Sequence, residues 1–240
     1  MSSSLERINP VTIKENEITG NESLALHLER YHFAGKHLIP GTVADVACGV
    51  GYGSHLLATE YGKTISSIQS VDIDEESISF AREHYRHEKI TFTCANAIKF
   101  ITPVILNNIV SLETIEHLPN PHLFVQHWIK QLAPGGRFIA SVPITPSMDA
   151  NPYHLSDFTR RTFKKMFEAA AMKEIQSFIQ IQPYSFFAVV KKKEERFSDK
   201  RKNLMGYYLT HPGKFFLRIR SVLTDGFINK YLVIVFEKSQ

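Results

Sequence analysis

The sequence predicts an α/β protein built on one doubly wound sheet of seven strands. Two observations predict it: short apolar runs alternate with amphipathic helical segments, and a glycine-rich turn follows the first run. A chain of 240 residues that is 43% hydrophobic and 22% charged can bury a sizeable core. We therefore expect a single α/β domain over residues 1–240, with helices on both faces of the sheet.

The first half of the chain supplies three strands and three helices. Apolar residues at helical spacing predict a helix over 21–38, within an N-terminal helical cap that covers residues 1–40. Strands are expected at 41–47, 65–73 and 89–96. The helices between them are expected at 51–62, closed by Gly62, and at 74–87, where an acidic first turn suits the helix dipole.

The second half repeats this alternation and then departs from it. Strands are expected at 108–112, 137–143, 174–182 and 230–238. Pro121 near the start and glycines after the end predict a helix within 121–136, and Thr159 is a suitable N-cap for a helix over 159–172. Residues 184–229 fit neither pattern, so we expect an insertion there that contacts the substrate or a partner.

Positive charge is concentrated in this insertion. Residues 191–220 hold ten Lys/Arg and three Asp/Glu, a surplus of seven, although the whole chain carries only +4. We expect 191–202 to be a solvated helix or loop, with an anion-binding patch as the alternative. The mixture of aromatic and arginine residues over 205–223 suits nucleic acid, a phosphorylated sugar carrier or a peripheral contact with an anionic membrane.

The compartment is predicted from what the sequence does not contain. No stretch approaches the roughly 20 apolar residues of a membrane span. The N-terminal residues are polar, unlike a signal peptide, and Cys48 and Cys94 do not form a disulfide framework. We expect a cytoplasmic protein; the sequence does not indicate its oligomeric state.

The first strand ends in a turn that suits a ligand with an ammonium group. The stretch ADVACGVGYGS places Gly49 and Gly51 in a tight strand-to-helix turn, but the spacing differs from the dinucleotide-binding fingerprint. Asp45, four residues before the first glycine, would repel a pyrophosphate and attract a cation. The alternative is a structural turn with no ligand.

The next two strand ends add acceptors for a nucleoside. Asp72, at the end of the second strand, can accept hydrogen bonds from two ribose hydroxyls, and Ile73 can lie against a purine. At the end of the third strand, Asn96 can bond an exocyclic amine and the Ala97 N–H a ring nitrogen. A molecule with an ammonium group, a ribose and an adenine is S-adenosylmethionine.

The chain resembles a class I S-adenosylmethionine-dependent methyltransferase over residues 40–182 and again at the last strand. The resemblance rests on VADVACGVGYGS, SVDIDEESISFAREHY, ITFTCANAIKF and the region from NIVSLETIEHL to the L-x-P-G-G turn and RFIASVP. Asn96 departs from the Asp of many members, and TPVILNN replaces an acidic stretch. The resemblance implies a Rossmann-like sheet of order 3-2-1-4-5-7-6 with strand 7 antiparallel. The expected cofactor-binding residues are Asp45, Ala47, Gly49, Gly51, Tyr52, Asp72, Ile73, Asn96, Ala97 and Glu113.

The stretch SLETIEHLPNPH lies just beyond the fourth strand, where a methyl acceptor would meet the cofactor. A helical turn from Glu113 would place Glu113, Glu116 and His117 on one face, and His154 follows the neighbouring strand. The E-x-x-E-H…H set resembles that of ubiquinone-pathway O-methyltransferases and small-RNA 2′-O-methyltransferases, which hold a divalent cation; bacterial glycan methyltransferases have similar stretches. The predicted metal ligands are Glu113, Glu116, His117 and His154. Alternatives are His117 as a base without metal, or a structural role.

We therefore predict an S-adenosylmethionine-dependent methyltransferase with His117 and His154 as its catalytic residues. The predicted acceptor is a hydroxyl on a sugar or another polyol-bearing small metabolite, with a divalent cation such as Mg or Mn as an additional cofactor. One alternative is 2′-O-methylation of RNA, suggested by the basic insertion. Another is a regulatory subunit that binds the cofactor without catalysis.

Overall fold

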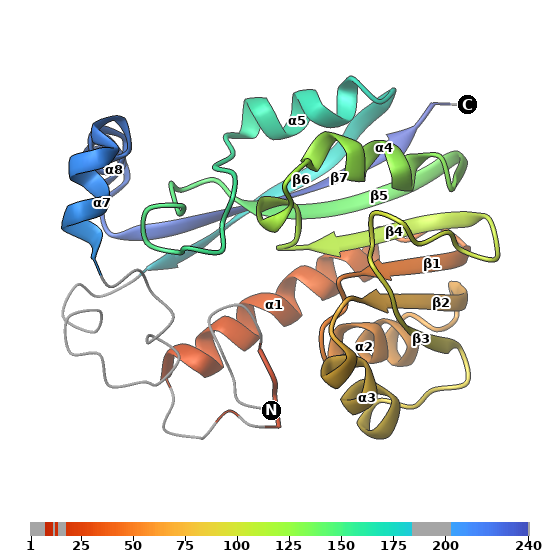
Figure 1. Ribbon diagram of the computed structural model, residues 1–240. Coiled ribbons are helices and arrows are strands. Elements are labelled where there is room, and N and C mark those ends of the chain that lie inside the picture. Colours follow the sequence, from red (N-terminus) through yellow and green to blue (C-terminus); the bar gives the residue numbers. More distant parts are fainter. Residues whose placement is uncertain (1–7, 12, 14–17, 184–202, 240) are drawn as a thin grey trace.

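The protein forms one seven-stranded sheet of order β3-β2-β1-β4-β5-β7-β6 (Figure 1). The computed structural model describes residues 8–11, 13, 18–183 and 203–239. The strands are β1 (Gly41–Val46), β2 (Ile65–Asp72), β3 (Ile90–Cys94), β4 (Leu106–Leu112), β5 (Leu132–Pro143), β6 (Met172–Pro183) and β7 (Ile228–Lys238). Strand β7 runs antiparallel to both β5 and β6, and the other pairs are parallel. The predicted fold class and strand order are confirmed.

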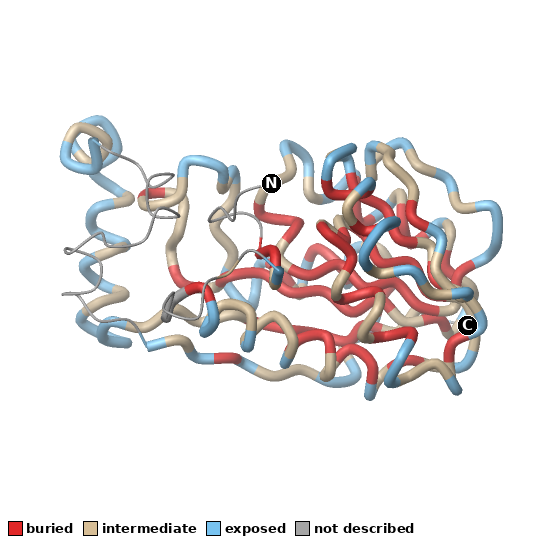
Figure 2. The backbone as a smooth tube through the Cα atoms, turned by 90° about the horizontal axis from the view of Figure 1, so that it is seen from below, coloured by how far each residue is buried: buried red, intermediate tan, exposed pale blue. Residues whose placement is uncertain are grey.

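Helices cover both faces of this sheet. On one face lie α1 (Ile18–Lys36), α2 (Tyr52–Glu60) and α3 (Glu75–His84); on the other lie α4 (Pro121–Ile129) and α5 (Arg160–Glu168) (Figure 1). Each face has its own core: Leu57 and Ile139 belong to the α1–α2 side, and Phe124, Phe138 and Phe167 to the α4–α5 side. The buried residues follow the strands through the centre of the molecule (Figure 2). This packing fixes the strand ends that carry the site.

Most predicted boundaries hold, because the capping residues act as the sequence indicates. Asp74 accepts a hydrogen bond from Ser77 N–H at the start of α3, and Thr159 forms a capping box with Thr162 at the start of α5. The helix expected within 121–136 is shorter, since α4 ends at Ile129. The L-x-P-G-G residues instead open β5, where the register against β4 shifts and Gly135 has φ +69°.

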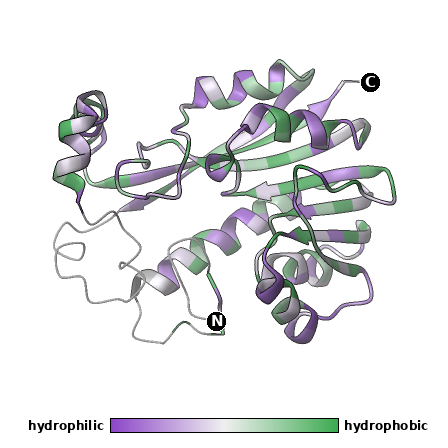
Figure 3. Cartoon of the chain, viewed as in Figure 1, coloured by the Kyte–Doolittle hydropathy of each residue, from purple (hydrophilic) through white to green (hydrophobic). Residues whose placement is uncertain are grey.

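The described part of the insertion is helical. It consists of α7 (Leu204–Thr210) and α8 (Pro212–Asp225), which stand together beyond one end of the sheet (Figure 1). Neither helix has a buried residue, and both carry hydrophobic and hydrophilic residues side by side (Figure 3). The predicted solvated segment 191–202 lies outside the described residues. Among those residues, no helix is long and apolar enough to cross a membrane.

Candidate functional site

The turn after β1 has the backbone geometry of a ligand cradle. Ala47, Gly49 and Gly51 have φ values of +62°, +55° and +89°. A Cβ on Gly51 would lie 2.7 Å from the Ala81 side chain, so packing as well as φ requires glycine there. A Cβ on Gly49 would meet nothing within 4 Å. Gly49 therefore borders open space beyond the end of the strand.

Asp72 lies at the end of β2, directly against this turn. Its carboxylate accepts hydrogen bonds from the N–H of Gly49 at 2.8 Å and of Asp74 at 3.0 Å, one on each oxygen. A carboxylate oxygen can accept more than one hydrogen bond, so both retain capacity for a ligand. Ile73 beside it is 67% exposed, an apolar side chain presented next to a carboxylate. The Asp72 carboxylate therefore suits the hydroxyls of a ribose, and the Ile73 side chain suits a flat apolar ring.

The end of β3 is held in place by its own side chains. The Asn96 Oδ1 accepts from the Ile98 N–H at 2.9 Å, which fixes the turn, and the Ala97 carbonyl accepts from the Trp128 indole at 2.9 Å. Strand β3 is the parallel neighbour of β2, with Cys94 opposite Asp72. Asn96 and Ala97 therefore continue the same edge of the sheet, as predicted.

Asp45, predicted to accept the ammonium group of a ligand, is enclosed by side chains of α1 and α2. It is 1% exposed and accepts hydrogen bonds from Ser54 at 2.5 Å and from Tyr31 at 3.2 Å. The Tyr31 ring covers Gly53, where a Cβ would lie 1.9 Å from it. Asp45 thus ties α1 and α2 to β1, and its role as a direct acceptor for an ammonium group stays a prediction.

Burial of Asp45 leads to a testable dependence of stability on pH. Desolvation raises the pKa of its carboxyl to about 7, although hydrogen bonds from Ser54 and Tyr31 oppose the rise. The folded state therefore keeps a proton that the unfolded state, with a pKa of about 4, has lost. The stability that protonated Asp45 contributes is fully present below about pH 4 and is lost as pH rises through about 7. We expect the free energy of unfolding of Asp45→Asn, relative to the wild type, to increase by about 2 to 3 kcal/mol when pH is raised from 5 to 8.

Urea unfolding of both proteins at these two pH values measures the difference. Because other carboxyls titrate in both proteins, their contributions cancel in the comparison. A constant difference between wild type and variant would show that Asp45 is ionised throughout.

Tyr52, predicted to flank the cofactor, follows the glycine turn and faces α1. Its hydroxyl lies 3.1 Å from His27 Nδ1, and its ring meets Tyr31 edge-on at 6.0 Å. Burial raises the pKa of its phenol, an effect that the positive charge of Arg30 opposes. The tyrosine therefore stays neutral and closes one side of the turn.

Beyond β4 and β5, three predicted acceptor-side residues come together. The side chains of Glu116, His117 and His154 each offer a ligand atom, and these atoms lie within 4.8 Å of one another. The rings of His117 and His154 meet edge-on at 4.7 Å. The Glu116 carbonyl accepts from the N–H groups of Leu155 and Ser156 at 2.8 and 3.2 Å, which holds the later loop against the earlier turn.

Glu113 is not part of this group, contrary to the predicted helical turn. The turn is a short 3-10 helix, η1 (Ile115–His117), and Glu113 precedes it with φ +52°. The Glu113 carboxylate instead accepts a hydrogen bond from Ser141 on β5 at 2.6 Å. The i, i+3, i+4 argument fails because the chain at 113 is left-handed rather than helical. Such strain in a non-glycine residue is common beside functional sites.

The two histidines are oriented through their Nδ1 atoms. His117 Nδ1 donates to the Tyr153 carbonyl at 3.2 Å, and His154 Nδ1 is hydrogen-bonded to the Ser147 hydroxyl at 2.6 Å. Burial, with a contribution from His117, lowers the pKa of His154 to about 4. His154 is therefore neutral at pH 7. Neutral imidazole is the form that binds a metal or accepts a proton.

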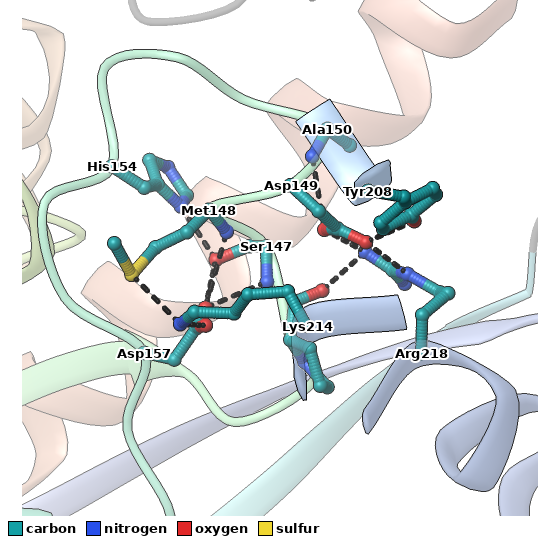
Figure 4. A network of polar contacts seen from close by, with 10 residues as sticks. Ser147, Met148, Asp149, Ala150, His154, Asp157, Tyr208, Lys214 and Arg218 are labelled. Carbon is teal, nitrogen blue, oxygen red and sulfur yellow. Dashed lines mark hydrogen bonds and ion pairs between the residues drawn. The ribbon is translucent and has the colours of Figure 1, made fainter. Parts of the chain in front are cut away.

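A polar clamp connects the His154 loop to α7 and α8 (Figure 4). Asp157 accepts from Lys214 at 2.6 Å and from the N–H groups of Ser147 and Met148 at 2.8 and 3.1 Å. Burial opposes ionisation of Asp157, but these donors hold the pKa of its carboxyl below the usual value. Asp149 accepts from Arg218 and Tyr208. The insertion thus positions Ser147, and through it His154.

The sequence reasoning missed Arg30 and the members of this clamp. Arg30 on α1 is 2% exposed, donates to Gln180 at 2.7 Å and lies over the Tyr231 ring. Its Nε makes no hydrogen bond, and among the described residues no carboxylate lies within ion-pair distance of it. The available signal was a charge between Leu26 and Ala34 on a helix stripe that is otherwise apolar. The clamp's bonds to α7 and α8 join residues more than fifty positions apart, so they left no local signal.

The strand order and the glycine turn with Asp72 beside it define the class I methyltransferase fold. The model of a family described as "Methyltransferase domain" matches residues 41–204, and the chain belongs to this S-adenosylmethionine-dependent methyltransferase family. Among solved structures, the YcgJ protein of Bacillus subtilis has a TM-score of 0.63 at 17% identity, over 92% of this chain and 99% of that one. The N-methyltransferase NodS of Bradyrhizobium japonicum, solved with S-adenosyl-L-homocysteine, has a TM-score of 0.60 at 12% identity, over 94% and 90%. At these identities the likeness concerns the fold alone.

Curated relatives are more similar in sequence over shorter segments. A probable S-adenosylmethionine-dependent methyltransferase of Mycolicibacterium smegmatis is 25% identical over 70% of this chain. A probable chloroplastic tocopherol O-methyltransferase of Oryza sativa is 33% identical over 42%, and a ubiquinone biosynthesis O-methyltransferase of Idiomarina loihiensis is 34% identical over 41%. The chain spans 64%, 28% and 41% of the lengths of these three relatives.

Proposed function

We propose that the protein transfers a methyl group from S-adenosylmethionine to a hydroxyl oxygen of a small molecule. The observation that carries the proposal is the group of Glu116, His117 and His154 beyond β4 and β5, at the same edge of the sheet as the glycine turn and Asp72. Two relatives that are named O-methyltransferases support transfer to oxygen. A sugar or another polyol-bearing metabolite is the proposed acceptor, because vicinal hydroxyls offer two oxygens to one site.

The cofactor half of the site would be held by residues of β1, β2 and β3. Asp72 has acceptor capacity for the ribose, Ile73 offers an apolar surface to the adenine, and the space beside Gly49 admits the chain between them. Arg30 supplies a buried positive charge near Tyr52, which suits the carboxylate of the methionine part. Bound S-adenosylmethionine supplies a methyl group that is already activated by its sulfonium.

The acceptor half must remove one proton and orient one oxygen. An alcohol becomes a good nucleophile only as its proton leaves. His154 is neutral at pH 7, and Glu116 places a buried carboxylate beside His117, so this group can accept the proton. One carboxylate and two imidazoles also fit a divalent transition metal with open positions for the acceptor. Such a cation would lower the pKa of the hydroxyl.

A turnover assay tests the proposed reaction. Purified protein, S-adenosylmethionine and a panel of hydroxylated metabolites are incubated, and S-adenosylhomocysteine is measured together with the methylated product. RNA and amine acceptors are included as separate arms. Methylation of an oxygen in a small molecule is the expected result. Transfer only to RNA or to nitrogen would reject the acceptor class, and absence of cofactor binding would reject methyl transfer itself.

The clamp leads to a prediction for this reaction. Lys214→Met removes the cation from Asp157, and Asp157 fixes the Ser147 that holds His154. We expect kcat to fall about tenfold, since a group that orients a reacting side chain typically contributes 10- to 100-fold. The Kd for S-adenosylmethionine, measured by calorimetry, should not change.

Lys230→Met is the matched control. It breaks a lysine–aspartate pair of the same length, to Asp225 at the far end of α8. An equal decrease of kcat in the two variants would show that the ion pairs of α8 affect the reaction only through the stability of the helix.

A further inference from the structure

Helix α8 turns its charged side toward the protein and an apolar side toward solvent. Lys214 and Arg218, four residues apart on one face, bond Asp157 and Asp149 of the sheet domain. Phe216, Ile219 and Leu223, at spacings of three and four residues, form another face and are 67%, 39% and 81% exposed. A surface helix ordinarily buries its apolar stripe, so this arrangement is inverted.

Helix α7 also exposes apolar residues to solvent and turns a polar group toward the protein. Met205 and Leu209 lie one turn apart and are 72% and 79% exposed, while Tyr208 between them points to Asp149. Single exposed apolar residues are ordinary, but here they gather on two adjacent helices that contain no buried residue (Figure 2). Such a surface indicates that something apolar covers it.

We propose that the apolar stripe of α8 (Phe216, Ile219 and Leu223) inserts into the headgroup region of an anionic lipid bilayer. Residues 203–224 contain no Asp or Glu. Of the three basic residues of α8, Lys214 and Arg218 are paired with Asp157 and Asp149, and Arg220 is exposed. Basic amphipathic helices with Phe and Leu on the other face lie in the bilayer interface. Residues 191–220 hold a surplus of seven positive charges, of which Asp157 and Asp149 neutralise two, and the remaining five favour anionic headgroups.

Other occupants fit these observations less well. Two copies joined through the stripe by a two-fold axis would bring two positive surpluses together, which disfavours self-association. Nucleic acid would use the charge but leave the aliphatic side chains of Ile219 and Leu223 in water. The bilayer satisfies both the charge and the apolar surface.

Co-sedimentation of the 240-residue protein with vesicles tests the proposal. We expect binding to vesicles of phosphatidylcholine with phosphatidylglycerol, weaker binding to phosphatidylcholine alone, and a decrease in high salt. The double variant Phe216→Ser/Leu223→Ser should lose affinity at least tenfold, or about 1.4 kcal/mol, because both side chains leave the lipid. Neither residue contacts the proposed reaction site, so circular dichroism and cofactor binding should be unchanged.

The control is Ile101→Ser/Ile105→Ser, which removes two aliphatic side chains that are each 74% exposed elsewhere on the surface. It should bind vesicles like the wild type. The proposal is overturned if the wild type does not bind anionic vesicles, or if both double variants lose affinity equally. It is also overturned if sedimentation velocity without lipid shows a dimer that only Phe216→Ser/Leu223→Ser abolishes.

Discussion

Asp72→Ala should weaken binding of S-adenosylmethionine by about 2 to 4 kcal/mol, or about 30- to 800-fold. The wild-type carboxylate would accept two ribose hydrogen bonds, and bonds to a charged group are the stronger kind. The variant also loses the acceptor for the N–H groups of Gly49 and Asp74, so the glycine turn is less well fixed. Asp72→Asn keeps one acceptor oxygen, so its affinity for S-adenosylmethionine should lie between those of the wild type and Asp72→Ala.

Calorimetric titration with S-adenosylmethionine and with S-adenosylhomocysteine measures this loss. Glu76→Ala is the matched control, because Glu76 is an exposed acid in the first turn of α3, a few residues from Asp72. Its affinity should equal that of the wild type. If Asp72→Ala bound the cofactor as tightly as Glu76→Ala, Asp72 would not be a ribose acceptor.

His117→Ala and His154→Ala should each lower kcat by about 10²- to 10⁴-fold, the range for loss of an acid–base group. If a divalent cation is held by Glu116, His117 and His154, the two variants fail together because each loses the metal. EDTA should then abolish turnover and one added ion should restore it. Affinity for the cofactor should stay nearly constant throughout.

The control for these variants is His122→Ala, which changes an exposed histidine at the start of α4. Metal content is measured before and after EDTA treatment. Full activity in EDTA with only His117→Ala inactive would leave His117 as a base without metal. Full activity of both histidine variants would make the whole stretch structural.

The positions of the proposed cofactor-binding residues could be predicted from the sequence because these residues follow strand ends directly. Asp72 and Asn96 each end or follow a strand, and parallel strands bring those ends to one edge. The positions of the proposed acceptor-side residues were predicted less well. His154 was found because it follows β5, but Glu113 was misplaced because its left-handed φ depends on the hydrogen bond to Ser141, twenty-eight residues away.

The surroundings of Asp45 and the end of α4 depend on tertiary contacts that local sequence preferences do not indicate. Asp45 was predicted to accept an ammonium group, and the sequence did not indicate that Tyr31 from α1 and Ser54 from α2 enclose it. The end of α4 was extended too far because a strand bulge at Gly135 has the same residues as a helix C-cap. In each case, the missing information was which distant segment packs against the residue.

The polar attachment of α7 and α8 has a consequence for local unfolding. Because no side chain of either helix is buried, their separation from the sheet exposes no core and requires only that ion pairs be exchanged for water. We therefore expect amide hydrogens of α7 and α8 to exchange through a sub-global opening, and those between β5 and β7 to exchange only on global unfolding. In that opening Asp157 loses Lys214 but keeps the N–H groups of Ser147 and Met148, so we expect the His154 loop to loosen without unfolding.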